Sequence, residues 1–527
     1  MMDIPLSLTR ILEYGASVHG DTTVTTWHGE GTGSEFDPAE EVTFRDIAAR
    51  AAAFAHAIHD ELGITSDERV GSFMWNCAEH LEVMFGTACK GAIFAPLNKQ
   101  LMNDQIRHII NHAEISAIVC DPRLAQQLGK VLVGTDSVGS VIITGAQPAQ
   151  QFAHLFPRGV EVYSYEALID GRSTVYDWPE LDERTAAALC YSTGTTGAPK
   201  GVLYSHRSLY LEAMQLRSSD SLCITHGETF LCCIPICHVL SWGVPFTCFM
   251  TGTPLVLPDA DVSAPTLAKA IAATSPRVAH GVPTIWIQLF VHYMHHPPER
   301  MTLTEIYAGG SPVPPTLIKM WEERYGVDVV HVWGMVETST VGSVARPPQG
   351  ASGDTRWAYR VSQGRIPASL EYRVVNDGQV VARTDRNAGE LQVRGPQVMR
   401  GYLGNPGATR NAIVDGWLRT GDIARVNPDA TVTVVDRAKD VFKYHGFQIA
   451  PAELEALMLT HPQIDDVAVA ERGGVPKAFV VKQGPLDEAQ VMEWVAASVT
   501  AYKKVRAVAF VDAIPRNAAG KILRNNL

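Results

Sequence analysis

Helix-like and strand-like segments alternate between residues 44 and 280, and this alternation restricts the chain to few architectures. The helical patterns place apolar residues at i, i+3 and i+4, whereas the strand patterns are short apolar runs. Helices are expected at Phe44–Leu62, Ala78–Lys90, Ile106–His112, Ser208–Arg217, Val239–Met250 and Ala264–Thr274. Strands are expected at Arg69–Met74, Ile115–Cys120, Phe230–Ile236, Pro254–Leu257 and Val278–His280. The alternation predicts α/β layers with a largely parallel sheet.

The pattern changes after residue 365. Short strands are expected at Leu370–Val375, Gln379–Ala382, Glu390–Arg394 and Thr431–Val435. Turn residues such as Asn376-Asp-Gly378 separate them, which predicts a small β subdomain. Beyond Asp436 an α+β piece is expected, with helices at Ala452–Thr460 and Glu488–Thr500 and strands at Val467–Ala470, Ala478–Val481 and Val508–Val511.

Charge and hydropathy exclude several kinds of protein. The net charge of −12 disfavours nonspecific binding to nucleic acid, so anionic substrates need locally basic sites. No uninterrupted apolar run reaches the ~18 residues of a membrane span. The first residues lack the basic and apolar regions of a signal peptide, so a cytoplasmic location is expected.

The nine cysteines have no disulfide-like spacing, which fits a reducing compartment. One group of residues has the side chains for a metal site, namely Cys232, Cys233, Cys237 and His238. These residues lie in an apolar run, so buried thiols acting as small hydrophobes are the preferred interpretation.

A loop rich in glycine and hydroxyl groups follows the apolar run Ala186–Cys190. Tyr191-Ser-Thr-Gly-Thr-Thr-Gly-Ala-Pro-Lys-Gly201 contains three glycines, four Ser or Thr residues and one lysine. Glycines let backbone N–H groups turn toward an anion, and the lysine adds a point charge. It is not a Walker A loop, because only two residues separate Gly194 from Gly197. The composition predicts a polyphosphate loop, with a solvated surface loop as the alternative.

Further motifs follow this loop in a fixed order. They are Cys237-His238, Ala308-Gly-Gly-Ser-Pro312, His331-Val-Trp-Gly-Met-Val-Glu-Thr338, Trp417-Leu-Arg-Thr-Gly-Asp422, Asp436-Arg-Ala-Lys-Asp440, Lys443-Tyr-His-Gly-Phe-Gln-Ile-Ala-Pro451 and Pro515-Arg-Asn-Ala-Ala-Gly-Lys-Ile-Leu-Arg524. Together they resemble the motif series of the adenylate-forming superfamily, which contains acyl-CoA synthetases, firefly luciferase and peptide-synthetase adenylation domains. His238-Val-Leu-Ser-Trp-Gly243 and Gly281-Val-Pro-Thr-Ile-Trp286 are most similar to medium- and long-chain fatty acyl-CoA synthetases and their methylmercaptopropionate–CoA ligase relatives.

The resemblance implies a fold and a reaction. Residues 1–435 would form a large α/β N-terminal domain with two α/β layered subdomains and a small β subdomain. Residues 436–527 would form a small, mobile α+β lid domain. A carboxylate would attack the α-phosphate of ATP to give acyl-AMP and pyrophosphate, and the thiol of CoA would then displace AMP. The implied ligands are a fatty acid, ATP, CoA and Mg²⁺. Dimers occur among the resembling long-chain enzymes, so a homodimer is an expectation here.

The resemblance also assigns a nucleotide site. The residues implied to hold the β- and γ-phosphates are Thr195, Thr196 and Lys200. Those implied to serve Mg²⁺ are Glu337 and Thr195, and those at the ribose are Asp422 and Arg437. The adenine would lie against Gly309, Gly310 and Ser311, with Trp333 stacked on it. The remaining nucleotide positions are Ser192, Thr193, Gly194, Gly197, His331, Gly334, Val336 and Lys439.

Lys521 is the main catalytic residue that the resemblance implies, because an ammonium near the α-phosphate offsets developing negative charge. The other implied catalytic residues are His238, Lys443 and Gln448. Asp436 is the implied hinge of the lid domain, whose rotation would present His445, Gly446 and Phe447 to CoA. The acyl pocket is expected along an aromatic-bearing helix that includes His238, Val239 and Trp242.

The chain departs from the family's pattern at a few positions. Val336 stands where the family usually has a threonine that contacts the adenylate phosphate, and losing one such bond costs about 1.5–3 kcal/mol. Two consequences are open: the reaction is slow, or a neighbour such as Thr338 compensates. Trp333 replaces a commoner tyrosine and preserves stacking. The short segment Glu471–Lys477 lies near the CoA route, so it puts the CoA step, rather than adenylation, in question.

Two alternatives to an acyl-CoA ligase stay open. One is an acyl-adenylate synthetase that loads a carrier-protein thiol. The other is a catalytically degenerate nucleotide- or acyl-binding homologue, which Val336 motivates. A luciferase-like oxygenase is disfavoured, because nothing in the sequence specifies an oxidation step.

Overall fold

The computed structural model describes residues 2–29, 39–192, 198–383, 388–444, 447–499, 503–516 and 522–527, without the side chains of Lys443, Phe447 and Gln448. The chain divides into two compact units. Unit 1 consists of Met1–Pro348, Pro367–Leu370 and Gly395–Asn411. Unit 2 consists of Gln349–Ile366, Glu371–Arg394 and Ala412–Leu527.

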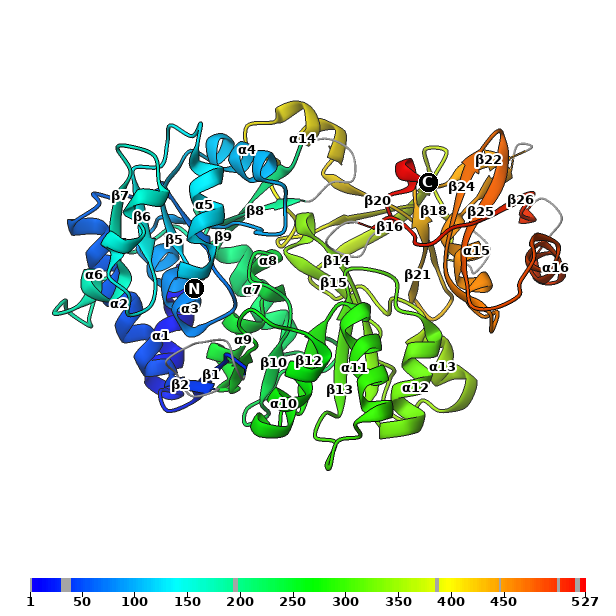
Figure 1. The fold of residues 1–527 in the computed structure, drawn as a ribbon, viewed down its shortest axis with the longest axis horizontal. Helices are drawn as coiled ribbons and strands as arrows, with labels where there is room; N and C mark the ends of the chain where they lie inside the picture. The colour runs from blue at the N-terminus through cyan, green and yellow to red at the C-terminus, as the bar shows by residue number, and fades with distance from the viewer. Residues whose placement is uncertain are drawn as a thin grey trace. The chain divides into compact units, whose positions relative to one another are not determined.

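A seven-stranded sheet forms one part of unit 1 (Figure 1), in the order β7-β6-β5-β3-β4-β8-β9. Its strands are β3 (Arg69–Phe73), β4 (Ile93–Pro96), β5 (Ile115–Cys120), β6 (Ser140–Ile143), β7 (Glu161–Ser164), β8 (Ala186–Ser192) and β9 (Lys200–Ser205). All neighbours are parallel except β8 and β9. The helices around this sheet include α2 (Phe44–Asp60), α3 (Ala78–Cys89), α4 (Asn103–Ala113), α5 (Ala125–Leu132) and α6 (Tyr165–Ile169). Apolar side chains of α4 and α5 share one buried core with β3, β5 and β6.

An eight-stranded sheet forms the second part of unit 1, in the order β15-β14-β13-β12-β10-β11-β1-β2. Its strands are β1 (Thr23–Trp27), β2 (Ala39–Thr43), β10 (Phe230–Cys232), β11 (Leu255–Leu257), β12 (Val278–Gly281), β13 (Glu305–Gly309), β14 (Asp328–Met335) and β15 (Thr340–Val344). The edge strands β2 and β15 are antiparallel, and the strands between them are parallel. The associated helices are α1 (Leu8–Val18), α7 (His206–Leu216), α9 (Val244–Thr251), α10 (Ala264–Thr274), α11 (Pro283–His295) and α12 (Pro315–Tyr325).

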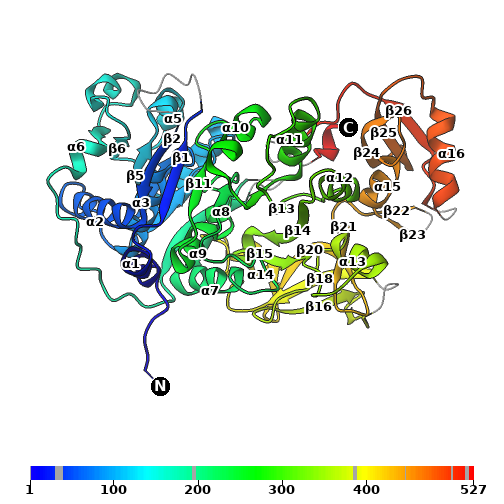
Figure 2. The same ribbon diagram turned by 90° about the horizontal axis from the view of Figure 1, so that it is seen from below.

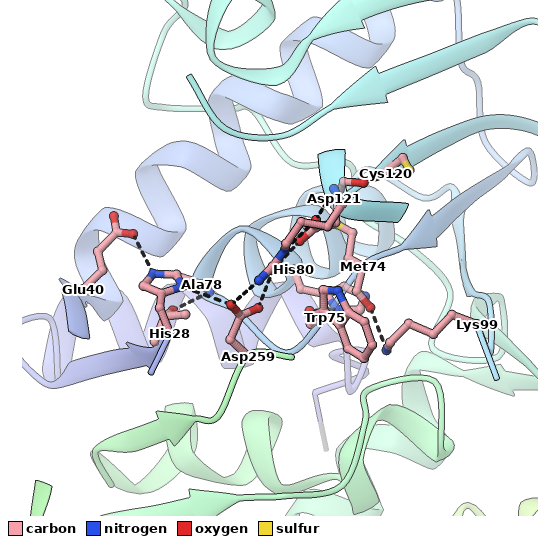
Figure 3. A network of polar contacts seen from close by, with 12 residues as sticks. His28, Glu40, Met74, Trp75, Ala78, His80, Lys99, Cys120, Asp121 and Asp259 are labelled. Atoms are coloured by element: carbon pink, nitrogen blue, oxygen red, sulfur yellow. Dashed lines mark hydrogen bonds and ion pairs between the residues drawn. The ribbon is translucent and has the colours of Figure 1, made fainter. Parts of the chain in front are cut away.

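A chain of alternating charges links the carboxyl ends of strands from both sheets (Figure 3). Arg123 donates to Asp121, which follows β5, at 2.6 Å, and to Asp259, which follows β11, at 2.7 Å. His28 follows β1 and lies 3.1 Å from Asp259 and 3.7 Å from Glu40 of β2. The Asp259 side chain is only 1% exposed. Buried opposite charges need partners, and these contacts therefore hold the two sheets of unit 1 together.

Unit 2 contains an antiparallel sheet and a smaller α+β part. The sheet has the order β17-β16-β18-β20-β19, with β21 on β20. Its strands are β16 (Glu371–Asn376), β17 (Gln379–Val380), β18 (Ala388–Arg394), β19 (Ile413–Val414), β20 (Trp417–Val426) and β21 (Val432–Arg437). The smaller part contains β22 (Phe442–Tyr444), β23 (Phe447–Ile449), β24 (Ile464–Arg472), β25 (Val475–Lys482) and β26 (Ala507–Phe510). Figure 2 shows α15 (Pro451–Met458) and α16 (Glu488–Ser498) beside β24, β25 and β26.

The predicted fold class is confirmed, since two α/β sheets, a small β sheet and a C-terminal α+β part are all present. One prediction was wrong: Val239–Met250 is not one helix. It divides into α8 (Val239–Trp242) and α9, and α8 has left-handed backbone, with φ values from 38° at Val239 to 58° at Trp242. The strand expected at Phe230–Ile236 ends at Cys232.

The predicted boundary at residue 436 and the mobility of the lid stay predictions. Within the described ranges, no helix combines the length and the apolar character that a bilayer crossing requires.

Candidate active site

The predicted phosphate loop connects β8 and β9, the antiparallel pair at one edge of the seven-stranded sheet. Ser192, the last residue of β8, lies opposite Lys200, the first residue of β9. Because the loop joins two antiparallel strands, it differs from a Walker A loop, which leads from a strand into a helix. Lys200 is exposed, and its Nζ lies 4.9 Å from the centre of the Tyr402 ring.

Glu337 lies on a single 3₁₀ turn, Val336–Thr338, directly after β14. Its side chain is largely buried, and Oε1 accepts a hydrogen bond of 2.7 Å from the Tyr402 hydroxyl. The Tyr204 hydroxyl of β9 donates to the carbonyl oxygen of Val336, also at 2.7 Å. The structure therefore brings the predicted metal-binding glutamate against the strand that leaves the predicted phosphate loop.

The predicted adenine positions occupy the ends of the neighbouring strands β13 and β14. A Cβ at Gly309 would stand 2.6 Å from the carbonyl oxygen of Val332 and 3.0 Å from the Trp242 ring, so this position requires glycine. Trp333 is 8% exposed and packs so closely on Gly342 of β15 that a Cβ there would stand 2.4 Å from the indole. Gly310 has a φ of 82°, which also favours glycine. Ser311 follows it and is half-buried.

Two more predicted positions lie on β14. His331 is buried, and burial lowers its pKa to about 4, so its imidazole is neutral at pH 7. A Cβ at Gly334 would stand 1.4 Å from the carbonyl oxygen of Thr340, at a bulge in the β14–β15 pair. Both residues therefore have structural reasons for their identity, and their contacts with a nucleotide stay predictions.

The left-handed α8 turn forms the predicted wall of the acyl pocket. Left-handed backbone costs a non-glycine residue roughly 1–2 kcal/mol, so tertiary contacts must hold it. Ser241 Oγ donates to the carbonyl oxygen of Ile234 at 2.9 Å, and Thr340 Oγ1 donates to that of Val239 at 3.3 Å. The Trp242 ring packs edge-on against His280, with ring centres 5.1 Å apart. Trp242, which lies beside the predicted adenine loop, is therefore held both by the backbone contacts of its turn and by the His280 ring.

His238 precedes this turn and is half-buried. Burial first, and then the positive charge of Lys99, lower its pKa to about 4. Lys99 is itself buried, and its Nζ donates to the carbonyl oxygen of Met74 at 3.1 Å and lies 4.0 Å from the Trp75 ring (Figure 3). At neutral pH His238 is therefore an uncharged hydrogen-bonding group, and the positive charge near it belongs to Lys99.

Unit 2 contains the predicted ribose and hinge residues. Arg437 Nε lies 2.8 Å from Asp422 Oδ1, across the β20–β21 pair, and the contact of either residue with a ribose stays a prediction. Asp436 is buried and accepts hydrogen bonds of 2.7 Å from the backbone N–H groups of Arg437 and Ala452. Burial raises the Asp436 pKa to about 6 despite these donors. Lys439 follows on an exposed turn.

Several predicted residues lie outside what the structure describes. Lys443 and Gln448 face each other in the β22–β23 pair, but their side chains, and that of Phe447, are not described. The predicted residues whose positions lie outside the described ranges are Thr193, Gly194, Thr195, Thr196, Gly197, His445, Gly446 and Lys521.

Of the two alternatives for Val336, the contacts of Thr338 disfavour compensation by its hydroxyl. Thr338 is fully buried, and its hydroxyl donates to the carbonyl oxygen of Met335 at 3.1 Å and accepts from the Met335 N–H at 3.2 Å. A hydroxyl committed to its own turn cannot replace the one that Val336 lacks. Sequence reasoning also missed Tyr402 and Tyr204, because a tyrosine in a loop or an apolar strand has no local signal of its contacts.

Comparison with known proteins defines the class. The model of the AMP-binding enzyme family matches residues 12–403, and that of the AMP-binding enzyme C-terminal domain matches residues 453–521. The crystal structure of an anthranilate CoA ligase with anthranoyl-AMP shares the fold, with a TM-score of 0.86 at 24% identity over 99% of this chain and 97% of the other. Fold and motifs thus define an adenylate-forming, AMP-binding enzyme.

Full-length relatives narrow this class. A medium-chain-fatty-acid–CoA ligase from Ectopseudomonas oleovorans is 33% identical over 100% of this chain and 96% of its own length. A 3-methylmercaptopropionyl-CoA ligase from Ruegeria lacuscaerulensis is 32% identical over 100% of this chain and 97% of its own. The chain belongs to the AMP-forming carboxylate–CoA ligases, whose co-substrates are ATP and CoA. This membership confirms the resemblance that the motif series predicted.

Proposed function

We propose that this ligase activates medium- or long-chain fatty acids. It adenylates the carboxylate with ATP and Mg²⁺, releases pyrophosphate, transfers the acyl group to CoA and releases AMP. The observation that carries the proposal is the junction between β9 and the Glu337 turn, where Tyr204 bonds Val336 at 2.7 Å and Tyr402 bonds Glu337 at 2.7 Å. This junction supports one site in which a lysine and a carboxylate serve the same polyphosphate.

The residues present fit a magnesium-bound nucleotide. Glu337 offers the carboxylate oxygen that Mg²⁺ prefers, and no arginine or lysine of the described ranges forms an ion pair with it. Bound Mg²⁺ would neutralise phosphate charge, and Lys200 would hold the terminal phosphates. Lys521 would approach the α-phosphate, and Asp422 with Arg437 would hold the ribose.

The fatty acyl assignment rests on the character of the α8 turn. Val239 and Trp242 are buried apolar side chains, and His238 is uncharged at pH 7. Such a wall suits an alkyl chain better than a polar acid. The names of the full-length relatives, a medium-chain-fatty-acid–CoA ligase and a 3-methylmercaptopropionyl-CoA ligase, support a fatty acid or a thioether acid. A cytoplasmic location, a homodimer and a hinge at Asp436 complete the proposal.

A pyrophosphate-release assay tests this function. The wild-type enzyme receives ATP, Mg²⁺ and one carboxylate from a panel that runs from acetate to oleate and includes methylmercaptopropionate and aryl acids. Each acid is tested with CoA, with a phosphopantetheinylated carrier protein, and with neither. We expect CoA-stimulated release with an optimum among medium or long chains, and loss of release when Mg²⁺ is chelated.

The other outcomes each reject a part of the proposal. Stimulation by the carrier alone would make the chain an acyl-adenylate synthetase. An optimum among aryl acids would reject the fatty acyl assignment. Binding of ATP without pyrophosphate release from any acid would identify the degenerate homologue that Val336 motivates.

A further inference from the structure

We propose that Tyr402 is a positioning residue that holds Glu337 and Lys200 apart before nucleotide binds, so that both stay available to Mg²⁺-ATP. This inference rests on the proposed function. Tyr402 carries neither a charge nor a metal-binding group, and its effect on the reaction acts through the two residues that it contacts.

The first argument concerns the backbone around Tyr402. Residues 397–403, here called the strap, contact both the turn that carries Glu337 and β9, the strand that follows the predicted phosphate loop. Ser339 Oγ donates to the carbonyl oxygen of Gln397 at 2.7 Å, and the Met399 N–H donates to that of Glu337 at 2.8 Å. At the other end, the Leu403 N–H donates to the carbonyl oxygen of Gly201 at 2.9 Å.

The strap is also fixed at Tyr402 itself. Tyr402 forms an antiparallel bridge with Val202 of β9, and its N–H donates to Thr409 Oγ1 at 2.9 Å. The backbone of Tyr402 is therefore held on two sides, independently of its side chain. Because its backbone is fixed, the Tyr402 side chain is suited to setting the distance between Glu337 and Lys200.

The second argument concerns the Tyr402 side chain, which has a different contact at each end. Its hydroxyl donates to Glu337 Oε1 at 2.7 Å, and its ring faces Lys200 Nζ at 4.9 Å. Glu337 is only 8% exposed, whereas Lys200 is exposed. Within the described ranges, no ion pair joins Lys200 to Glu337. The phenol thus contacts both charged groups, the carboxylate through its hydroxyl and the ammonium through its ring.

The third argument concerns the strength of the contacts. A lysine in direct contact with a largely buried carboxylate is difficult to separate, because the carboxylate would be left without a partner. An exposed cation over an aromatic ring is held more weakly. A neutral hydroxyl gives Glu337 a hydrogen bond without neutralising its charge. Tyr402 therefore gives each residue a partner without pairing the two with each other.

The test is calorimetric binding of nucleotides to the whole chain, with no acid and no CoA present. Tyr402→Phe removes only the hydroxyl and keeps the ring. Tyr165→Phe is the matched control, because the Tyr165 hydroxyl also donates to a buried glutamate, Glu82, at 2.7 Å, on the α3 and α6 side of the seven-stranded sheet. Three titrants are used: ATP with Mg²⁺, ATP with a chelator, and AMP.

We expect Tyr402→Phe to weaken binding of Mg²⁺-ATP by about tenfold, as for the loss of a hydrogen bond to a charged group. Binding of AMP and of metal-free ATP should change less than twofold, and Tyr165→Phe should match the wild type with all three titrants. An unchanged Kd for Mg²⁺-ATP would overturn the inference, and equal losses for Mg²⁺-ATP and AMP would reduce Tyr402 to a structural role. If the wild type itself bound no Mg²⁺-ATP, the proposed function would fail first.

Discussion

Replacing His28 by glutamine should remove a pH-dependent part of the stability of unit 1. His28 lies between Asp259 at 3.1 Å and Glu40 at 3.7 Å, and its side chain is 14% exposed. The hydrogen bond to Asp259, and then the contact with the Glu40 carboxylate, raise the pKa of His28 from 6.5 to about 9. Glutamine keeps a hydrogen-bond donor but cannot carry the charge, so the substitution isolates the effect of protonation.

The size and the pH window follow from that shift. One pKa unit corresponds to about 1.4 kcal/mol, so a rise from 6.5 to about 9 stabilises the folded state by about 3 kcal/mol. Because the folded state binds the proton more tightly, this stabilisation is complete below pH 6.5 and is lost as the pH rises through 9. Asp259 then still has Arg123 as its partner, so the loss should not unfold the chain.

Hydrogen exchange of peptides covering β1 and β11 measures the opening free energy where His28 acts. At fixed ionic strength, His28→Gln should lower it by about 3 kcal/mol at pH 6 and by almost nothing at pH 9.5. His56→Gln is the control, because the His56 ring bonds a backbone carbonyl, that of Val175, at 2.9 Å. A difference between His28→Gln and wild type that stays constant from pH 6 to pH 9.5 would refute this account of the charge network.

Two further substitutions test the nucleotide site. Val336→Thr should raise the rate of adenylation by about tenfold, because it restores a hydroxyl worth about 1.5–3 kcal/mol in the transition state; an unchanged rate of pyrophosphate release would show that Val336 is no deficit. Gly342→Ala places a Cβ 2.4 Å from Trp333, which should cost about 1–3 kcal/mol of stability and weaken AMP binding. Gly139→Ala, whose Cβ would meet its nearest neighbour at 4.0 Å, is the control, and equal melting temperatures for the two variants would contradict the packing argument.

The sequence predicted those elements whose boundaries have local causes. Ile115–Cys120 coincides with β5, because an apolar run ends at Asp121-Pro122, and Ala264–Thr274 coincides with α10. The left-handed turn at Val239–Trp242 has no such signal, since none of its side chains favours positive φ. Contacts from Ile234, His280 and Thr340 hold it, and these residues are distant in sequence or have no pattern of their own.

The candidate site, like the fold, was predictable only where the residues carry a local motif. Motif context alone assigned Asp422 and Arg437 to the same ribose, and in the structure Arg437 Nε lies 2.8 Å from Asp422 Oδ1. Tyr402 was not predictable, because its contacts reach Lys200 and Glu337 across 202 and 65 positions of the sequence. Charged and glycine-rich motifs reveal the groups that meet a ligand, whereas the neutral side chains that separate those groups appear only once the chain is folded.

The predicted acyl wall and the predicted adenine loop of unit 1 are in direct contact, which bears on how the ligase would select its acid. Trp242 of the predicted acyl wall contacts Gly309 of the predicted adenine loop, where even a methyl group would stand 3.0 Å from its ring. Thr340, just beyond the Glu337 turn, donates to Val239 of the same wall at 3.3 Å. A close-packed contact transmits displacement, because neither side can yield without moving the other. In the proposed acyl pocket, an acid that shifts Trp242 would therefore also disturb the predicted adenine loop, and we expect the length of the acid to change the KM for ATP.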